Sequence, residues 1–350
     1  MPVFVDNLSR DHHLFEGMKE SWAPGRLSSR SALSGCINIG LVNNMPDSAL
    51  ISTERQLFEL LKGAAGRIPV RLRLYTLPTV QRGEWGRQYM SRHYSDIDEL
   101  WVAKLDGLIV TGTEPRAPHL TEEPYWDAFA QVIDWAKENT TSAILSCLAV
   151  HGAVLHLDGI DRQQLPAKCI GVFEQEKNMD HPLLRGAPSR LKIPHSRLNE
   201  VREETLVASG YSVLTKSSNA GVDTFVKQQS KSLFVYFQGH PEYEAQSLLG
   251  EYRRDIGRYL RGENDIYPTM PMSYFDDQTE ELLLAFQRRA VSDRRDELMA
   301  SFPVETVAMK LKSTWREAAT CIYRNWLLYM SARSRRRQPR PNDLIHSEHL

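Results

Sequence analysis

Short apolar runs alternate along this chain with segments in which apolar residues recur every three or four positions. The runs at 36–42, 70–75, 106–111 and 142–146 have the composition of buried strands. Helical spacing follows from about residue 52, over 125–138 and directly after residue 147. Strands and helices of these lengths predict an α/β three-layer sandwich, with a mostly parallel sheet covered on both faces.

Beyond residue 168 the pattern changes to shorter apolar runs, which predict an antiparallel extension. These runs lie at 170–173, 191–193, 211–214, 224–226 and 233–237. Helices are expected over 244–260, over the highly charged segment 279–300 and over 304–332. The predicted organisation is an N-terminal arm with little structure of its own (1–34), a main domain (35–262), a loop and helical insertion (263–312), a C-terminal helix packing on the domain (313–332) and a basic disordered tail (333–350).

The junction at Cys147 is the first candidate for chemistry. An apolar strand stops there and an amphipathic helix starts at once, which is the pattern of a nucleophile elbow. The helix N-terminus favours the thiolate, and neighbouring backbone N–H groups are free to bind an oxyanion. A buried structural cysteine is the alternative for this residue taken alone.

A second strand end carries His240, with Glu242 two residues on. Covalent catalysis by a thiol needs an imidazole to take the proton and a carboxylate to orient that imidazole. The carboxyl ends of parallel strands meet at one edge of a sheet, where ligands bind. We therefore predict a catalytic group of Cys147, His240 and Glu242.

Composition and charge limit the kinds of molecule that the protein is expected to bind. The 350 residues carry a net charge of −1, which argues against nucleic acid or an anionic membrane surface and favours a small-molecule substrate. No apolar run reaches the roughly 20 residues of a membrane span, and no secretory signal is recognisable, so a cytoplasmic location is expected. The four cysteines are scattered, so neither disulfides nor a cysteine zinc site is indicated. No glycine-rich phosphate loop supports nucleotide hydrolysis.

These motifs together resemble the homoserine O-succinyltransferase and O-acetyltransferase family, whose fold is flavodoxin-like and that of class I glutamine amidotransferases. The matching segments are Asn43-x-Met-Pro, Asp106-Gly-Leu-Ile-Val-Thr-Gly112, Tyr125-Trp126, Cys147-x-Ala-Val, Pro194-His-Ser-Arg197, Gly239-His-Pro-Glu-Tyr243, Ala245-Gln-Ser-Leu with Arg254-Asp255, and Trp315-Arg through Asn325-Trp326-Leu. The resemblance covers most of the chain.

The resemblance implies that Cys147 carries an acyl group taken from acyl-CoA, that His240 is the general base and that Glu242 orients it. It implies acyl-CoA as a co-substrate, no other cofactor and no metal, and a possible homodimer. Lys168, Ser196 and Arg254 match the family's substrate-binding positions. A guanidinium suits the carboxylate of homoserine or a related hydroxy amino acid such as serine.

Three departures from the family bear on specificity. The family lysines after Met-Pro are replaced by Asp47-Ser48, so the oxyanion hole is expected to be backbone alone. Arg116 stands in the loop that selects the acyl group, where it could pair with a succinyl carboxylate or point into solvent. His151 replaces a glutamine, and 279–312 looks like an insertion.

Two other functions use the same scaffold. A glutamine-hydrolysing amidotransferase shares the three catalytic residues but needs a synthetase partner to receive ammonia, and no synthetase module is visible in the chain. A non-catalytic binding protein would not need Cys147, His240 and Glu242 together.

Overall fold

A computed structural model describes residues 3–6, 12–16 and 35–337 of the chain. Its main sheet has eight strands, in the order β1-β3-β2-β4-β5-β12-β11-β8. The strands are β1 (Val3–Val5), β2 (Ile37–Val42), β3 (Val70–Tyr75), β4 (Gly107–Val110), β5 (Ser142–Ser146), β8 (Ser212–Val213), β11 (Thr224–Gln229) and β12 (Ser232–Phe237). Strands β1 to β5 and β12 are parallel, whereas β11 and β8 continue the sheet in antiparallel pairing.

The parallel strands explain where a site should form. Without the edge strand β1, their order is β3-β2-β4-β5-β12, which is the flavodoxin-like order 2-1-3-4-5. In such sheets ligands bind outside the carboxyl ends of the strands, near the point where the strand order reverses. Here that point lies between β2 and β4, and β5 is the next strand.

Successive residues of the strands pack into two separate apolar cores, which makes the domain a three-layer sandwich. On β12, for example, Val235 faces one core and Tyr236 the other. The first core is covered by α2 (Asp47–Ala65) and α11 (Arg316–Arg337), and the second by α5 (Trp126–Asn139) and α6 (Leu148–Asp158). Short helices α3 (Glu84–His93), α4 (Ile97–Val102) and α7 (Glu203–Ala208) complete the main domain. The predicted α/β sandwich is confirmed.

The predicted antiparallel extension is present and includes a second sheet. Its order is β10-β9-β6-β7, built from β6 (Gln163–Lys177), β7 (Arg190–Glu200), β9 (Thr215–Ser217) and β10 (Gly221–Val222). Strand β6 is 15 residues long and extends beyond the run expected at 170–173 on both sides.

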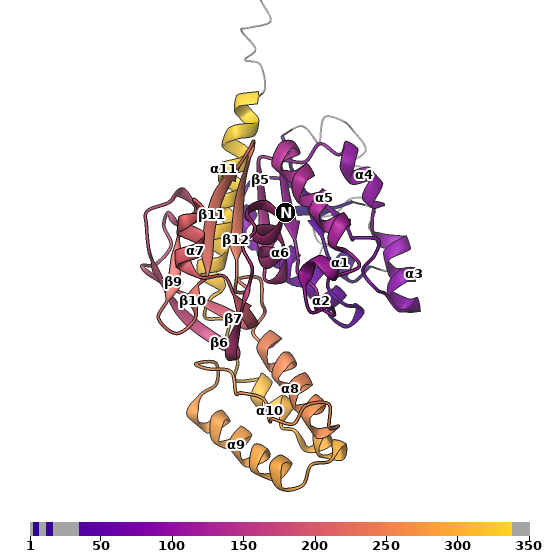
Figure 1. Cartoon of the computed structure of the whole chain (residues 1–350), viewed down its shortest axis with the longest axis vertical. Helices are drawn as coiled ribbons and strands as arrows, with labels where there is room; N and C mark the ends of the chain where they lie inside the picture. Colours follow the sequence, from indigo (N-terminus) through magenta and orange to yellow (C-terminus); the bar gives the residue numbers. More distant parts are fainter. Residues whose placement is uncertain (1–2, 7–11, 17–34, 338–350) are drawn as a thin grey trace, which may run out of the picture.

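The helices after the main domain form their own small core. Helix α8 (Ser247–Leu260) packs with α9 (Asp277–Ser292), the 3-10 turn Asp296–Ser301 and α10 (Val304–Ala308) around Tyr252, Phe286 and Phe302. Figure 1 shows α8 and α9, in orange, below the sheets. This unit contains the segment expected as an insertion.

Helix α11 returns from this unit to the centre of the main sheet. Trp326 donates its indole N–H to Ser142 Oγ at 2.9 Å, and a Cβ on Gly107 would lie 2.7 Å from the sulfur of Met330. The C-terminal helix therefore packs directly on β4 and β5.

The structure differs from the sequence predictions at several boundaries. The first main helix begins at Asp47 rather than near 52, and the charged helix ends at Ser292. The helix expected over 304–332 is two helices separated by residues 309–315, because Trp315 turns into a core beside Ile170 and donates to Tyr243 O at 2.8 Å.

The N-terminal arm is more ordered at its described residues than expected. Strand β1 pairs with β3, and α1 (His13–Glu16) follows. The rest of the arm, and the tail beyond residue 337, lie outside the described residues. In the described part of the chain, no helix is long and apolar enough to cross a membrane.

Candidate active site

Cys147 lies between β5 and α6 in a conformation that side chains rarely adopt. Its φ is 54° and its ψ −115°, and it is the N-cap residue of α6. Its N–H donates to Phe237 O at 2.9 Å, which ties the turn to the end of β12. A sharp, strained strand-to-helix turn of this kind projects the side chain from the sheet edge, so the predicted elbow is present.

Backbone donors for an oxyanion lie beside this thiol. Leu148 is the first residue of α6, and the first N–H groups of a helix have no partner within it. A Cβ on Gly112 would lie 2.9 Å from the Leu148 nitrogen, so the loop after β4 passes directly against the helix start. This close approach requires glycine and forms the wall of a potential oxyanion hole.

His240 completes the reactive pair. Its Nδ1 lies 2.9 Å from Glu242 Oε1, and that carboxylate oxygen also accepts from Ser146 Oγ at 3.3 Å. Burial opposes charge on His240, but the charges of Cys147 and Glu242 and hydrogen bonds with both raise its pKa well above the usual value. The ring of Tyr243 stacks on the imidazole with centroids 4.1 Å apart. The arrangement favours an imidazolium at His240 beside Cys147.

The three residues assigned to the acceptor by resemblance also come together, around two acids of α8. Lys168 Nζ donates to Asp255 Oδ2 at 2.6 Å and lies 3.7 Å from Glu251 Oε2. Ser196 donates its hydroxyl to Glu251, and Arg254 Nη2 lies 3.1 Å from Asp255 Oδ1. The cluster therefore presents cations, acids and a hydroxyl within one group.

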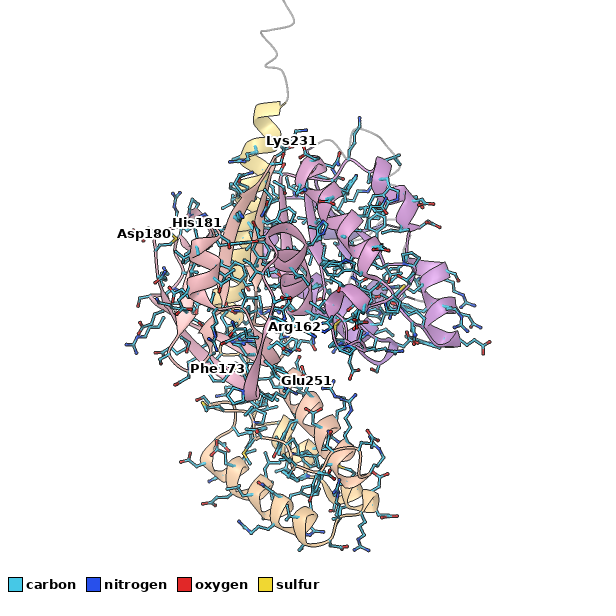
Figure 2. All side chains as sticks on the ribbon, viewed as in Figure 1. Arg162, Phe173, Asp180, His181, Lys231 and Glu251 are labelled. Atoms are coloured by element: carbon cyan, nitrogen blue, oxygen red, sulfur yellow. The ribbon has the colours of Figure 1, made fainter. Side chains whose placement is uncertain are left out.

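Glu251 links this group of charged residues to His240 through Tyr243, and the sequence did not single it out. Tyr243, which stacks on His240, donates its hydroxyl to Glu251 Oε1 at 2.5 Å. Figure 2 labels Glu251 near the junction of the main domain and the lower helices. The available signal was helical spacing, because Glu251 precedes Arg254 and Asp255 by three and four residues.

Arg116 lies in the loop after β4, and its side chain is exposed. Its guanidinium donates to Gln81, and its backbone N–H donates to Glu123 Oε1 at 2.5 Å. It borders a small cavity with Thr113 and Tyr125, two residues that also line a neighbouring cavity against Leu148. Arg116 therefore borders the cavity next to the one that Leu148 lines, but its side chain is exposed and already paired with Gln81.

Arg162 is a second cation that the sequence did not single out. It is half-buried after α6, and no hydrogen bond or ion pair with another described residue holds it. Burial lowers its pKa, and the charges of Tyr125, Glu123 and Cys147 partly offset this effect. Arg162, labelled in Figure 2, is therefore a guanidinium without an ion-pair partner among the described residues, within electrostatic range of Cys147.

The loop that replaces the family lysines is held by other contacts. Asp47 accepts from Gly83 N at 2.8 Å and lies 3.3 Å from Arg82 Nη1. The buried Arg82 guanidinium also donates to the carbonyl oxygens of Met45 and Asn43. Arg82 is a structural cation of this loop.

A cavity of about 440 Å³ lies elsewhere. It is on the second sheet, between Arg190, Lys192, Asn219 and Met272. None of the predicted site residues lines it. His151, the other departure, is buried and lies 3.3 Å from Gln238 Oε1 through Nε2, and burial lowers its pKa to about 3.

Fold and site together define an α/β protein with a cysteine, a histidine and a glutamate at the carboxyl edge of a flavodoxin-like sheet. The family model described as homoserine O-succinyltransferase matches residues 6–336. The chain belongs to this family.

Curated relatives carry the same name. The chain is 49% identical to homoserine O-succinyltransferase of Rhodopseudomonas palustris, over 88% of this chain and 92% of the relative. It is 46% identical to the enzyme of Bradyrhizobium japonicum, over 84% and 90% respectively.

Solved structures are more distant. A glutamine amidotransferase from Thermotoga maritima matches with 14% identity and a TM-score of 0.47, covering 84% of this chain and 98% of that one. A glutamine amidotransferase from Methylobacillus flagellatus matches with 13% identity and the same TM-score, covering 84% and 95%.

Proposed function

We propose that this protein transfers a succinyl group from succinyl-CoA to the hydroxyl of L-homoserine through a thioester on Cys147. The observation that carries the proposal is the strained cysteine turn facing a buried histidine–glutamate pair. The names of the curated relatives support the acyl group and the acceptor.

The first half-reaction loads the cysteine. The Cys147 thiolate attacks the carbonyl carbon of the CoA thioester, and the backbone N–H of Leu148 stabilises the oxyanion. When the intermediate collapses, the bond to the CoA sulfur breaks and His240 gives that sulfur its proton. The products are free coenzyme A and succinyl-Cys147.

The second half-reaction reverses these roles. Neutral His240 takes the proton of the homoserine hydroxyl, and the hydroxyl oxygen attacks the carbonyl carbon of the Cys147 thioester. The bond to the sulfur then breaks and regenerates the thiolate beside the imidazolium. Glu242 holds the His240 ring in one orientation in both steps, through the 2.9 Å contact at Nδ1.

The acidic cluster on α8 suits the acceptor. An amino acid zwitterion brings a carboxylate that Arg254 can bind in two places and an ammonium that Glu251 can bind. In the structure these groups pair with one another, so the incoming zwitterion exchanges one set of ion pairs for another. Lys168 and Ser196 hold the two acids in position from β6 and β7.

The donor side offers two cations for the succinyl carboxylate. Arg116 borders the cavity beside Thr113 and Tyr125, and Arg162 lies within the electrostatic range of Cys147. A carboxylate that leaves water needs such a partner, whereas an acetyl group does not. This requirement favours succinyl-CoA over acetyl-CoA.

Intact-protein mass spectrometry tests the proposal. The protein is mixed separately with succinyl-CoA, acetyl-CoA and glutamine, and each adduct is then offered homoserine or serine. A succinyl adduct that is absent from Cys147→Ala and discharged by homoserine supports the proposal. A glutamyl adduct with release of ammonia, and none from succinyl-CoA, would instead establish the glutamine-hydrolysing alternative.

A further inference from the structure

A buried histidine–carboxylate cluster lies where α1, α2 and α3 meet. His12 and His13, at the start of α1, pack on Glu54 of α2 and on Tyr89 of α3. His12 Nε2 lies 3.3 Å and His13 Nε2 3.6 Å from Glu54 Oε2. The two imidazole rings are stacked with centroids 4.4 Å apart, and the ring of His93 packs against His12 at 4.6 Å.

The cluster contains a polar atom that the described residues leave unsatisfied. The side chains of His12 and Glu54 have no exposed surface. His13 Nε2 is also buried and has no hydrogen-bond partner among the described residues, although its Nδ1 lies 3.2 Å from the Tyr89 hydroxyl. A buried imidazole nitrogen without a hydrogen-bond partner beside a carboxylate is a candidate metal ligand.

The distances from the two histidine nitrogens to Glu54 Oε2 fit tetrahedral coordination of a metal ion. Metal–ligand bonds of about 2.0–2.1 Å give ligand separations of about 3.3 Å, close to the two histidine–carboxylate distances. The Tyr89 oxygen lies 2.8 Å from His12 Nε2 and 2.7 Å from Glu54 Oε2, at the open side of the group. Two imidazoles with one carboxylate suit Zn²⁺ and similar transition ions better than Mg²⁺ or Ca²⁺.

We propose that His12, His13 and Glu54 bind one divalent transition ion such as Zn²⁺, with the Tyr89 hydroxyl as a fourth ligand. Coordination uses the His13 lone pair that the described residues leave unpaired. A ligating His12 Nε2 keeps its ring proton on Nδ1, so the 3.2 Å contact from Leu14 N–H is given up. The scattered cysteines of the sequence indicated no zinc site, whereas the ligands proposed here are two histidines and a carboxylate.

The ion would fasten the N-terminal segment to the domain. Glu54 also accepts from the Tyr94 hydroxyl at 2.5 Å, and Asn43 donates to that hydroxyl at 3.1 Å. Asn43 Oδ1 accepts from Met45 N at 3.2 Å, in the loop that follows β2. The site therefore stabilises residues 12–13 and, through this chain of hydrogen bonds, the loop beside the active site.

The test uses the full-length protein with Cys147→Ala as the background, so that the active-site thiol cannot bind the probe and turnover is not measured. After treatment with a chelator and dialysis, Zn²⁺ is titrated by calorimetry and Co²⁺ by its visible spectrum. We expect one equivalent of each ion, tetrahedral cobalt bands and a higher Tm with Zn²⁺. Absence of saturable binding overturns the proposal.

Variants locate the ion. His13→Ala and, as a smaller change, His13→Asn should weaken Zn²⁺ binding more than about tenfold and remove the cobalt bands. The control is His156→Ala, which removes a histidine bonded to Asp134 at 3.0 Å outside the cluster and should bind as the background does. If both His13 variants bind Zn²⁺ as the background does, the ion is held elsewhere and the proposal is wrong.

Discussion

The three proposed catalytic residues and the cluster proposed to bind the acceptor are built in opposite ways. Cys147, His240 and Glu242 are positioned by backbone at two strand ends, and His240 and Glu242 are 7% and 6% exposed. Lys168 and Arg254 reach the cluster on long side chains, and the Arg254 side chain is half exposed. The first region is buried, and the second is a set of partly exposed ion pairs.

The difference indicates which region can tolerate change. Preorganised groups in a site without water stabilise charge strongly, so small displacements there are costly. Exposed ion pairs contribute little to stability and exchange partners readily, which suits a site that must bind and release a zwitterion. Substitutions should therefore affect the rate in the first region and acceptor binding in the second.

The largest expected effect is at the nucleophile. Cys147→Ala should lower kcat by at least about 10³-fold, because no other group supplies the covalent step. Cys169→Ala, which removes another half-buried thiol, should leave kcat nearly unchanged. Steady-state assays of both purified proteins, with circular dichroism as the check on folding, decide the matter. Near-normal turnover by Cys147→Ala would remove the thioester from the mechanism.

Substitutions of His240 and of its orienting acid Glu242 should differ in the size of their effect on kcat. His240→Asn should lower kcat by about 10²–10⁴-fold, since it removes the base. Glu242→Gln should cost less, because an orienting group contributes less than the base that it holds. The kcat values of the two variants provide the measurement. Equal activity of wild type and both variants would exclude the buried pair from catalysis.

In the acceptor cluster, binding rather than rate should change. Arg254→Lys should raise KM for homoserine about tenfold while kcat changes little, because an ammonium cannot reproduce the two-point contact of a guanidinium. The control is Arg253→Lys, an exposed neighbour on the same helix. Kinetics with varied homoserine at saturating succinyl-CoA measure both constants. If Arg254→Lys and Arg253→Lys give the same KM, Arg254 does not bind the acceptor.

The donor side compares the two candidate cations. Removing the cation that binds the succinyl carboxylate should reduce the preference for succinyl-CoA over acetyl-CoA by about ten- to hundredfold, the value of a charge-assisted hydrogen bond of about 1.5–3 kcal/mol. Arg116→Ala and Arg162→Ala are each assayed with both donors. A selective loss in one variant identifies the selector. If both variants lose the two activities equally, the selector is another residue.

The smallest effect concerns the backbone of the elbow. Cys147→Gly should have a free energy of unfolding about 1 kcal/mol higher than Cys147→Ala, because glycine adopts a φ of 54° without the strain of a Cβ. Both variants lack the thiol, so urea denaturation isolates the conformational cost. A less stable glycine variant would show that the turn is not strained.

Local patterns were enough to place the proposed catalytic residues at strand ends. Cys147 follows an apolar run and precedes a helical one, and His240 closes another apolar run, so both could be placed at strand ends before any contact was known. Parallel pairing of β12 with β5 then brings these ends together. For Glu251 the local signal was only its helical spacing from Arg254 and Asp255, because its role depends on contacts with Ser196 and Lys168 from the second sheet.

The boundaries of helices and strands also depend on contacts that the local sequence pattern does not reveal. The spacing over 304–332 is compatible with one helix, yet the chain breaks where Trp315 enters a core with Ile170 and Leu248. Strand β1 is only three residues long and depends on the edge of β3 for its hydrogen bonds. Neither feature has a local cause that periodicity can detect.

By itself, the sequence determined the α/β class, the strand and helix that meet at Cys147, and the His240–Glu242 motif, because these depend on apolar periodicity and on neighbours a few residues apart. The tertiary structure decided which charged residues converge on Glu251 and Asp255, that Arg162 has no ion-pair partner among the described residues, and how the N-terminal segment meets Glu54. Those outcomes depend on burial and on contacts between segments far apart in the chain, where the entropy of ordering and the loss of water are balanced only by the packed fold.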